Sequence, residues 1–306
     1  MTDEQKGALE RIEEFIEDPN ATVLTVSGYA GTGKTSVMQI VAEKHKSDAH
    51  VVFTASTNKA ASVLGQKVKS KGFESSTLDS FFGFVQDQKQ GAKRYNARDT
   101  QTYVAGESKI VPGSIVIIDE ASMINKEKYD LINKAAAMNG CKIIYLGDIA
   151  QLPPVGEQTG PVFTNPENLV QLTEVKRTGD NAILKEATRL RKPNGTFSYE
   201  SEFNSNGEGV GFTTSIEKIK AVIKKFAEGL KNDVNAIKIV TGTNKSVEDY
   251  NDFVRECLGY DSDTPQVGEI LMGYDNWGRQ YNSVTRKTTY KFINSEEYVI
   301  TEVGEE

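Results

Sequence analysis

The chain has 306 residues, 38% of them hydrophobic and 26% charged, and a formal net charge of −7. This length and composition are typical of a globular protein with room for two domains. No apolar run approaches the roughly 20 residues of a membrane-spanning helix, and residues 1–10 lack a secretory signal, so the sequence predicts a cytoplasmic protein without a membrane partner. The negative charge disfavours a protein that coats nucleic acid, although it is compatible with a local basic groove. The two cysteines and two histidines form no cluster typical of a zinc or disulfide framework.

The first half of the chain alternates between expected strands and helices. Apolar residues at helical spacing predict a first helix over residues 3–17. The expected strands then cover residues 22–27, 50–56, 114–120 and 141–148, and the helices between them cover residues 34–46, 58–70 and 126–138. Apolar strands that alternate with helices predict an α/β fold with a mostly parallel sheet covered on both faces. Ligands of such sheets bind at the carboxyl ends of the strands.

Two regions depart from this alternation. Residues 85–112 are polar and glycine-bearing, and they are expected to form an insertion, either with a small hairpin around TQTYVAGES or as a flexible loop. After residue 178 the alternation is weaker. Helices are expected over residues 181–191, 215–229 and 245–258, a strand over residues 236–242, and a strand-rich tail from residue 264.

A glycine-rich loop gives the strongest functional signal. The segment GYAGTGKT, residues 28–35, fits the P-loop pattern and lies between an expected strand and an expected helix. Its backbone N–H groups would surround the phosphates of ATP, the Lys34 ammonium would reach the β- and γ-phosphates, and the Thr35 hydroxyl would bind Mg²⁺. The expected nucleotide-binding residues of the loop are Gly28, Ala30, Gly31, Thr32, Gly33, Lys34, Thr35 and Ser36.

Two acidic residues end the next apolar strand. The segment IVIIDEAS places Asp119 and Glu120 at the carboxyl end of that strand, where adjacent carboxylates favour a bound cation. Asp119 would hold Mg²⁺, and Glu120 would orient and deprotonate the attacking water. The two motifs together predict a nucleotide hydrolase. The alternative is a pair of acids that cap a helix.

Two further polar residues follow buried strands. Gln151 lies in YLGDIAQLPPVG, where its amide could sense a γ-phosphate, or it could belong to an ordinary surface loop. Arg177 lies in QLTEVKRTGD, where two halves of the chain join. It is either a surface cation at a strand end or a residue that reaches into an active site.

Eight segments occur in an order that resembles one protein family. They are EQKGAL, GYAGTGKT, TASTNKAASVL, STLDSFF, IIDEASM, GDIAQLPPVG, LTEVKRT and TGTNKSVEDYN. This set resembles the superfamily 1B DNA helicases, and within them the Dda-like members of the RecD-like group. The resemblance extends from Gln5 to about Asn251 and is looser from there to residue 306.

The resemblance implies a P-loop NTPase with two RecA-like domains. The first would cover residues 1–177 and carry a small pin subdomain at about residues 85–112. Residues 178–306 would form a partial second RecA-like domain with the start of an SH3-like insertion. The family uses ATP and Mg²⁺ to move 5′ to 3′ on single-stranded DNA and to unwind a forked duplex. A monomer in the cytoplasm of a phage host, with replication or recombination proteins as partners, is implied as well.

The resemblance also assigns site residues. It implies that Gln5 reads adenine and that Arg177 contacts the γ-phosphate. The implied DNA contacts are Thr57, Asn58, Lys59, Thr77, Ser80, Asn244 and Lys245, and Tyr103 is a candidate for the tip of the pin. The family usually has histidine where this chain has Asp79, and an acid beside phosphates weakens that one contact.

Two late motifs of the family, a threonine–histidine–glutamine element and a TR arginine finger, do not occur in the 306 residues. We therefore expect this chain to bind ATP, to hydrolyse it weakly and to fail to unwind DNA by itself. Two other functions remain open: a regulatory ATPase switch that does not translocate, and a DNA-binding remnant without useful catalysis.

Overall fold

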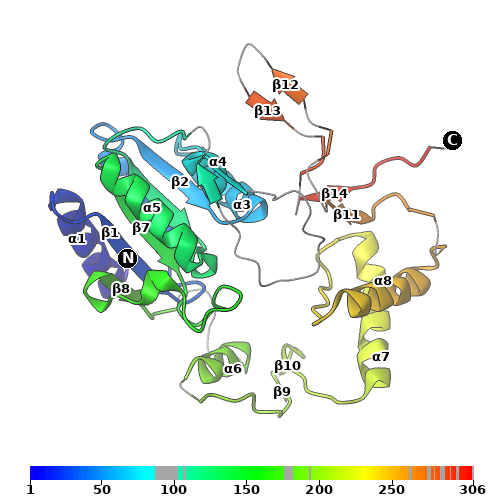
Figure 1. Ribbon diagram of the computed structural model, residues 1–306. Coiled ribbons are helices and arrows are strands. Elements are labelled where there is room, and N and C mark those ends of the chain that lie inside the picture. The colour runs from blue at the N-terminus through cyan, green and yellow to red at the C-terminus, as the bar shows by residue number, and fades with distance from the viewer. Residues whose placement is uncertain are drawn as a thin grey trace. The chain divides into compact units, whose positions relative to one another are not determined.

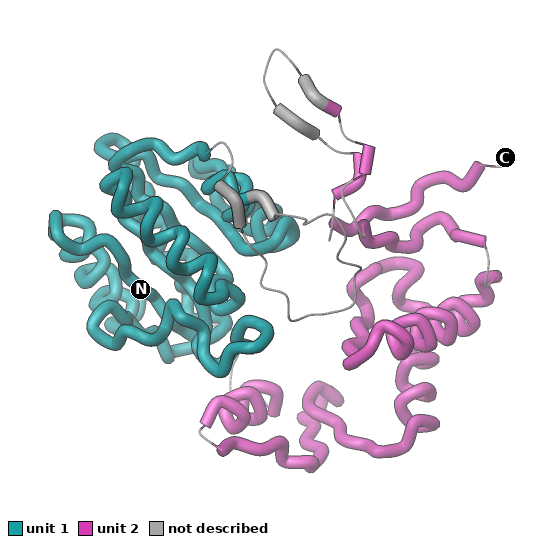
Figure 2. Tube along the Cα trace, viewed as in Figure 1, with its two compact units in different colours: residues 1–179 teal, residues 180–306 magenta. Residues whose placement is uncertain are grey.

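The computed structural model describes two compact units, residues 1–179 and 180–306 (Figure 2). Its described residues are 1–86, 103–105, 108–175, 182–192, 194–261, 264–273, 277–278, 280–282, 287–289, 291–293 and 296–304. The candidate nucleotide site belongs to the first unit.

A six-stranded sheet forms the centre of the first unit (Figure 1). Its strands are β1 (Val23–Gly28), β2 (Val51–Ala55), β3 (Ser75–Thr77), β6 (Ile115–Asp119), β7 (Lys142–Gly147) and β8 (Leu169–Leu172). They lie in the order β3-β2-β6-β7-β1-β8, and every neighbouring pair is parallel. All six carboxyl ends therefore meet at one edge of the sheet, as the sequence predicted for an α/β fold.

Helices cover both faces of this sheet. The helices are α1 (Asp3–Glu17), α2 (Lys34–His45), α3 (Asn58–Lys69), α4 (Leu78–Phe82) and α5 (Lys126–Met138). Buried residues of α1, α2 and α3 form one core cluster, whereas those of α4 and α5 form a second cluster. Alternate residues of β6 divide between the two, because Ile117 belongs to the first cluster and Val116 and Ile118 to the second. This alternation is the period of a strand that is buried on both faces.

Side-chain caps begin several of these helices where the sequence changes from extended to helical. The Thr2 hydroxyl accepts a hydrogen bond from the Gln5 N–H (3.1 Å), and the Gln5 amide oxygen accepts one from the Thr2 N–H (3.0 Å), which is a capping box. Thr57 caps α3 and Asn125 caps α5 in the same position. These caps satisfy N–H groups that a helix leaves without partners in its first turn.

The expected insertion at residues 85–112 is partly described. β4 (Phe84–Gln86) pairs antiparallel with β5 (Tyr103–Ala105), so the segment TQTYVAGES supplies one strand and its partner lies at the start of the insertion, not within that segment as expected. Residues 87–102 and 106–107 lie outside the described residues.

The second unit contains helices and short strand pairs. Its helices are α6 (Ala182–Arg191), α7 (Ile216–Ala227) and α8 (Asn244–Leu258). Its strands are β9 (Glu202–Phe203), β10 (Gly209–Val210), β11 (Ile270–Met272), β12 (Gln280–Asn282), β13 (Lys287–Thr289) and β14 (Glu297–Val299). They form the antiparallel pairs β9–β10, β11–β14 and β12–β13. An ion pair between Arg255 and Glu269 links α8 to the segment before β11.

The strand predicted over residues 236–242 is absent from the described structure. Those residues form no strand pair there, and Val240 is 94% exposed. A strand needs a neighbour that takes up its backbone N–H and C=O groups, and local β-propensity does not supply one. The prediction for this segment was wrong in the structure described here.

Candidate nucleotide site

The loop after β1 has the backbone that close contact with phosphates requires. Gly31 and Gly33 have φ angles of 85° and 86°, a region that glycine occupies without a steric penalty. A Cβ atom at Gly28 would lie 2.8 Å from Thr32 Oγ1 and 2.9 Å from the Leu172 carbonyl oxygen. The loop is therefore packed against the end of β8, and its glycines are needed at these positions.

Lys34 is the first residue of α2, and its ammonium bonds to the loop itself. Lys34 Nζ donates to the carbonyl oxygens of Gly28 (2.5 Å) and Tyr29 (3.1 Å). The Thr32 hydroxyl also donates to the Tyr29 carbonyl (2.9 Å). These bonds hold the ammonium in the centre of the loop, where anionic phosphate oxygens would take the place of neutral carbonyls.

Gln5 lies against the same loop. Its amide nitrogen donates to the Thr32 carbonyl oxygen in a buried hydrogen bond of 2.8 Å. A Cβ atom at Gly33 would lie 2.5 Å from this amide nitrogen, so the contact also depends on glycine. The structure thus places the residue expected to read adenine beside the expected phosphate loop, and its role in base recognition stays a prediction.

Asp119 is the last residue of β6, and Glu120 follows it at the carboxyl edge of the sheet. Glu120 has φ 53° and ψ 42°, a left-handed conformation that is uncommon for residues other than glycine and that clusters at functional sites. Asp119 Oδ1 accepts the Glu120 N–H (2.9 Å), and the Ser56 hydroxyl donates to the Glu120 carbonyl (3.2 Å). These contacts from β6 and the end of β2 hold the strained residue.

Burial raises the pKa values of both acids. For Asp119 burial is the main cause, and the nearby charges of Lys34 and Lys67 act in the opposite direction. For Glu120 burial again contributes most, followed by the negative charge of Asp119. A raised carboxyl pKa suits a residue that accepts a proton near neutral pH.

The donor set fits Mg²⁺. Oxygen ligands from one or two protein groups, completed by water and phosphate oxygens, are what Mg²⁺ prefers. Asp119 ends β6, Thr35 is the second residue of α2 after β1, and β6 and β1 both flank β7. The penalty that raises the Asp119 pKa is one that a bound cation would remove.

An Asp119→Asn variant is expected to be more heat-stable than the unaltered protein when no nucleotide is present. Because the folded-state pKa of Asp119 is raised, this group favours folding below its unfolded pKa and loses that contribution as pH rises through the folded pKa. Asparagine keeps the oxygen that accepts the Glu120 N–H and carries no charge. Each gain of about 1 kcal/mol would raise Tm by about 2–4 °C. Thermal melts from pH 4 to 8 should show the difference growing with pH, and a lower Tm at pH 8 would contradict the prediction.

Gln151 is connected to the residues that follow the acids. Its amide oxygen accepts a hydrogen bond from the Ser122 hydroxyl (3.0 Å), and its N–H donates to the Asp148 carbonyl (2.9 Å). Asp148 is buried, and its carboxylate accepts the Ala150 N–H (3.0 Å). The segment carrying Gln151 is therefore built as a turn at the end of β7, directly beside the segment after β6.

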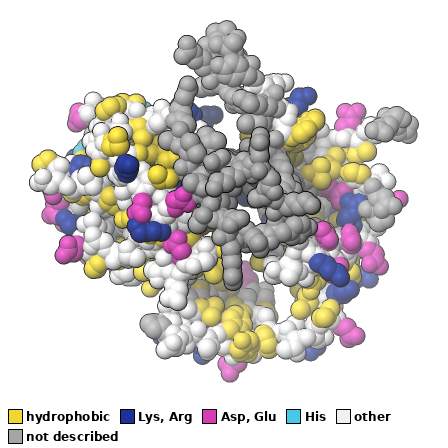
Figure 3. All heavy atoms as spheres, in the orientation of Figure 1, with side chains coloured by type: hydrophobic (Ala, Val, Ile, Leu, Met, Phe, Trp, Pro, Cys, Tyr) yellow, Lys and Arg dark blue, Asp and Glu magenta, His cyan; other side chains and the backbone are white. Residues whose placement is uncertain are grey.

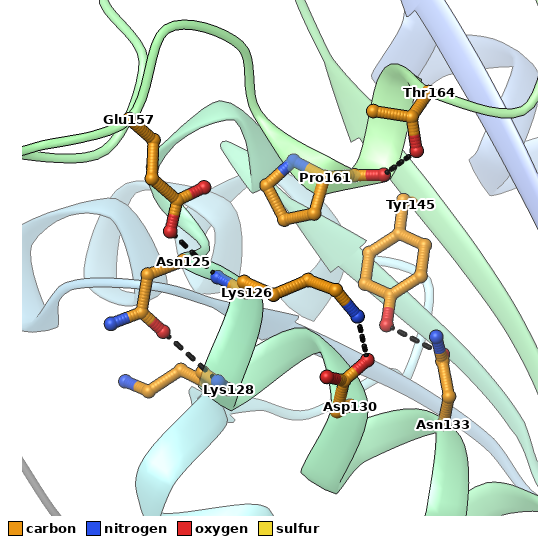
Figure 4. A network of polar contacts seen from close by, with 9 residues as sticks. All are labelled: Asn125, Lys126, Lys128, Asp130, Asn133, Tyr145, Glu157, Pro161 and Thr164. Atoms are coloured by element: carbon orange, nitrogen blue, oxygen red, sulfur yellow. Dashed lines mark hydrogen bonds and ion pairs between the residues drawn. The ribbon is translucent and has the colours of Figure 1, made fainter.

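A second contact holds the far end of this turn (Figure 4). Glu157 accepts a hydrogen bond from the Lys126 N–H (2.8 Å) at the start of α5, while Asn125 accepts the Lys128 N–H (2.9 Å). The hydroxyl of the buried Tyr145 donates to Asn133 of α5 (2.9 Å). The two segments after β6 and β7 are thus joined at Ser122 and again at Lys126.

The expected DNA contacts of the first unit lie where helices begin after β2 and β3. Thr57 Oγ1 accepts the Ala60 N–H (3.1 Å) as the cap of α3, whose first residues are Asn58 and Lys59. Thr77 Oγ1 accepts the Ser80 N–H (3.2 Å) as the cap of α4. Helix N-termini bind phosphates, so this placement is compatible with the predicted role.

An ion pair reduces the negative charge that Asp79 brings to the expected DNA contacts. Asp79 forms a 2.6 Å ion pair with Lys128 of α5, and the Ser80 hydroxyl accepts a bond from Lys109 (3.0 Å). On the face of the molecule seen in Figure 3, the described Lys and Arg side chains are interspersed with Asp and Glu. The charge of Asp79 is therefore partly neutralised within the unit.

The remaining predicted residues lie in the second unit or outside the described side chains of the first unit. Asn244 and Lys245 begin α8 in the second unit, after the cap Thr243. Tyr103 lies in β5, where only its backbone is described, and Arg177 lies outside the described residues. Their roles stay predictions.

Sequence reasoning missed three side chains that organise the site. Ser56 bonds to Glu120, Ser122 to Gln151, and Glu157 to the start of α5. Ser122 could have been found, because it follows the acidic pair by two residues in IVIIDEAS. The other two contacts join segments 64 and 31 residues apart, and no local pattern indicates them.

The parallel sheet, the loop after β1 and the acidic pair after β6 define a RecA-like P-loop NTPase domain. Residues 1–205 match the protein family described as an AAA domain. The ATP-dependent DNA helicase dda of Enterobacteria phage T4 is 29% identical over 286 residues, which covers 89% of this chain and 60% of that protein. An uncharacterised protein of Acanthamoeba polyphaga mimivirus is 25% identical over 301 residues, covering 88% of this chain and 59% of that protein.

A solved structure has the same fold. It describes DNA unwinding at forked duplex DNA by two coordinating Pif1 helicases, and it is 18% identical, with a TM-score of 0.52 over 99% of this chain and 72% of that one. The chain belongs to the AAA domain family, and its sequence is similar to that of the phage T4 Dda helicase. It spans 59% and 60% of the lengths of the two curated relatives. In the described residues, no helix is long and apolar enough to cross a membrane.

Proposed function

We propose that this chain is an ATP-hydrolysing motor of a DNA helicase that moves 5′ to 3′ on single-stranded DNA. The observation that carries the proposal is the meeting of three elements at neighbouring strand ends: the phosphate loop after β1, the turn with Gln151 after β7 and the acidic pair after β6. A P-loop with an acidic pair at the end of a nearby strand is typical of a nucleotide hydrolase.

In the proposed reaction, the phosphates of ATP enter the loop and Lys34 exchanges its two carbonyl partners for phosphate oxygens. Thr35 and Asp119 would hold Mg²⁺, which neutralises charge on the phosphates. Glu120 orients the attacking water and accepts its proton, a role supported by its raised pKa and by its fixed backbone. Gln5 would contact the adenine from the first turn of α1.

Gln151 connects hydrolysis to the rest of the motor in this proposal. Its amide can bond to the γ-phosphate, and its bond to Ser122 carries any movement into the segment that follows Glu120. The bond between Ser56 and Glu120 leads on to Thr57, Asn58 and Lys59 after β2. A short chain of contacts thus links the hydrolysing residue to the expected DNA contacts.

The domain assignment is part of the proposal. The first unit would be the first RecA-like motor domain, with the pin subdomain inserted at about residues 85–112. The second unit would be a partial second RecA-like domain with the start of an SH3-like insertion. The names of the relatives support DNA, and forked duplex DNA in particular, as a partner. Single-stranded DNA as a partner rests on the family resemblance. A monomer in the cytoplasm, acting with replication or recombination proteins, is the setting that we propose.

Steady-state ATP hydrolysis with and without single-stranded DNA tests this function. We expect Mg²⁺-dependent turnover that rises at least severalfold on adding a thymidine oligonucleotide, because DNA contacts and hydrolysis are coupled through β2 and β6. A matched reaction with the corresponding duplex, lacking any single-stranded tail, is the control. Turnover that DNA leaves unchanged would favour a regulatory ATPase switch, and salt-sensitive DNA binding without turnover would favour a binding remnant.

A further inference from the structure

Glu4, in the first turn of α1, binds the segment that leaves β8. Its carboxylate accepts three hydrogen bonds: from the Thr173 N–H (2.7 Å), the Glu174 N–H (2.9 Å) and the Thr173 hydroxyl (2.6 Å). Thr173 and Glu174 follow Glu4 by 169 and 170 residues in the sequence. Both N–H groups bond to Oε2, and the hydroxyl bonds to Oε1. These bonds lower the pKa of Glu4, the Thr173 hydroxyl most of all.

The bound segment also touches the phosphate loop. The Tyr29 N–H donates to the Leu172 carbonyl (3.3 Å), and Gly28 approaches Leu172 so closely that an added Cβ would lie 2.9 Å from its side chain. Residues 172–174 are therefore held between the first residues of the loop and the first turn of α1. A displacement of Thr173 would reach Gly28 through Leu172.

The next residue of α1 bonds to the other end of the loop. Gln5 donates to the Thr32 carbonyl (2.8 Å), so Glu4 and Gln5 connect one helical turn to both the exit of β8 and the phosphate loop. In the sequence, Arg177 follows Glu174 by three residues. The first turn of α1 thus contacts both the phosphate loop and the segment that follows β8.

We propose that Glu4 is a positioning residue for ATP hydrolysis, which holds the exit of β8 against the nucleotide site. The inference rests on the proposed function, since it assigns Glu4 a part in turnover. The carboxylate of Glu4 bonds to Thr173 and Glu174, so its proposed effect on the nucleotide acts through these two residues. Its loss should therefore reduce kcat far more than it changes the KM for ATP.

Three variants separate positioning from a general effect on α1. Glu4→Ala removes all three bonds. Glu4→Gln keeps them, because its amide oxygen can accept both N–H groups while its amide nitrogen donates to the Thr173 hydroxyl oxygen. Asp3→Ala is the matched control, because Asp3 is also an acid in the first turn of α1 and its carboxylate forms an exposed ion pair with Lys6 (2.9 Å) instead of bonds to the exit of β8.

The expected result is a loss of kcat in Glu4→Ala of about 10-fold, within the range of up to about 10²-fold that small misplacements cause. The KM for ATP should change little. Glu4→Gln should recover most of the lost kcat, and Asp3→Ala should behave as the unaltered chain. Equal kcat values for Glu4→Ala and Asp3→Ala, or no recovery in Glu4→Gln, would overturn the proposal.

Hydrogen exchange distinguishes a failure of this inference from a failure of the proposed function. The Thr173 and Glu174 amides should exchange faster in Glu4→Ala than in Asp3→Ala, and this can be measured whether or not the protein hydrolyses ATP. If the unaltered chain shows no turnover but the exchange result is as expected, Glu4 has no role in catalysis but still holds Thr173 and Glu174 in place. If the Thr173 and Glu174 amides exchange at the same rate in Glu4→Ala and Asp3→Ala, Glu4 does not hold this segment either.

Discussion

A Glu120→Gln variant is expected to lose ATP turnover by about 10²- to 10⁴-fold, the usual contribution of a general base. Glutamine keeps the size of the side chain but cannot accept the proton of the attacking water. It also removes a carboxylate whose pKa is raised by burial and by Asp119, so nucleotide binding should be retained or strengthened. Single-turnover hydrolysis and equilibrium binding of a fluorescent ATP analogue measure the two effects separately.

A Glu127→Gln variant provides the control for this experiment. Glu127 lies in the first turn of α5 and undergoes the same change of charge, away from the end of β6. We expect it to hydrolyse ATP at the unaltered rate. If Glu120→Gln kept more than about a tenth of normal turnover, general-base catalysis by this residue would be excluded, since even the weakest such contributions are about 10²-fold.

Replacing Arg177 by alanine is expected to reduce hydrolysis by about 10³- to 10⁵-fold, the effect of arginines that stabilise a phosphoryl transition state. The resemblance to superfamily 1B helicases supports this role. The structure supplies the starting point, because Leu172 at the end of β8 lies against Gly28 of the phosphate loop. The chain thus leaves β8 beside the nucleotide site, five residues before Arg177.

Lys176→Ala is the matched control for Arg177, since it removes the neighbouring cation of the same segment. Its turnover should stay within a fewfold of normal. The kcat of both variants is to be measured at saturating ATP, so that a loss of affinity is not mistaken for a loss of catalysis. Normal turnover in Arg177→Ala would return this residue to the status of a cation at a strand end.

Much of the first unit could be predicted because its signals are local. The runs ending at Gly28, Asp119 and Gly147 are apolar and β-branched, and each is followed by a turn or a helix. The P-loop pattern also predicted the strand that precedes it, β1, and the helix that follows it, α2. The order of the strands was not predicted, because it depends on which strands find each other across long stretches of chain.

Predictions were weaker where a residue depends on a distant partner. Residues 236–242 have the composition of a strand but form no strand pair in the described structure. Gln5 was correctly placed at the start of a helix, yet its bond to Thr32 spans 27 residues and could not be derived from spacing. Thr57 and Thr77 were identified through family resemblance, and the structure adds that both hydroxyl groups cap helices.

The strand order has a consequence for how such a domain could diversify. Most elements assigned to the nucleotide follow β6, β7, β1 and β8, which are contiguous in the sheet. The expected DNA contacts at residues 57–59, 77 and 80 lie at the ends of β2 and β3, on the other side. Substitutions after β2 and β3 can therefore accumulate without disturbing the phosphate loop. Exchanging the segments after β2 and β3 between homologues should change the proposed DNA preference and leave the residues assigned to ATP hydrolysis unchanged. The Ser56–Glu120 bond would have to be kept in such an exchange.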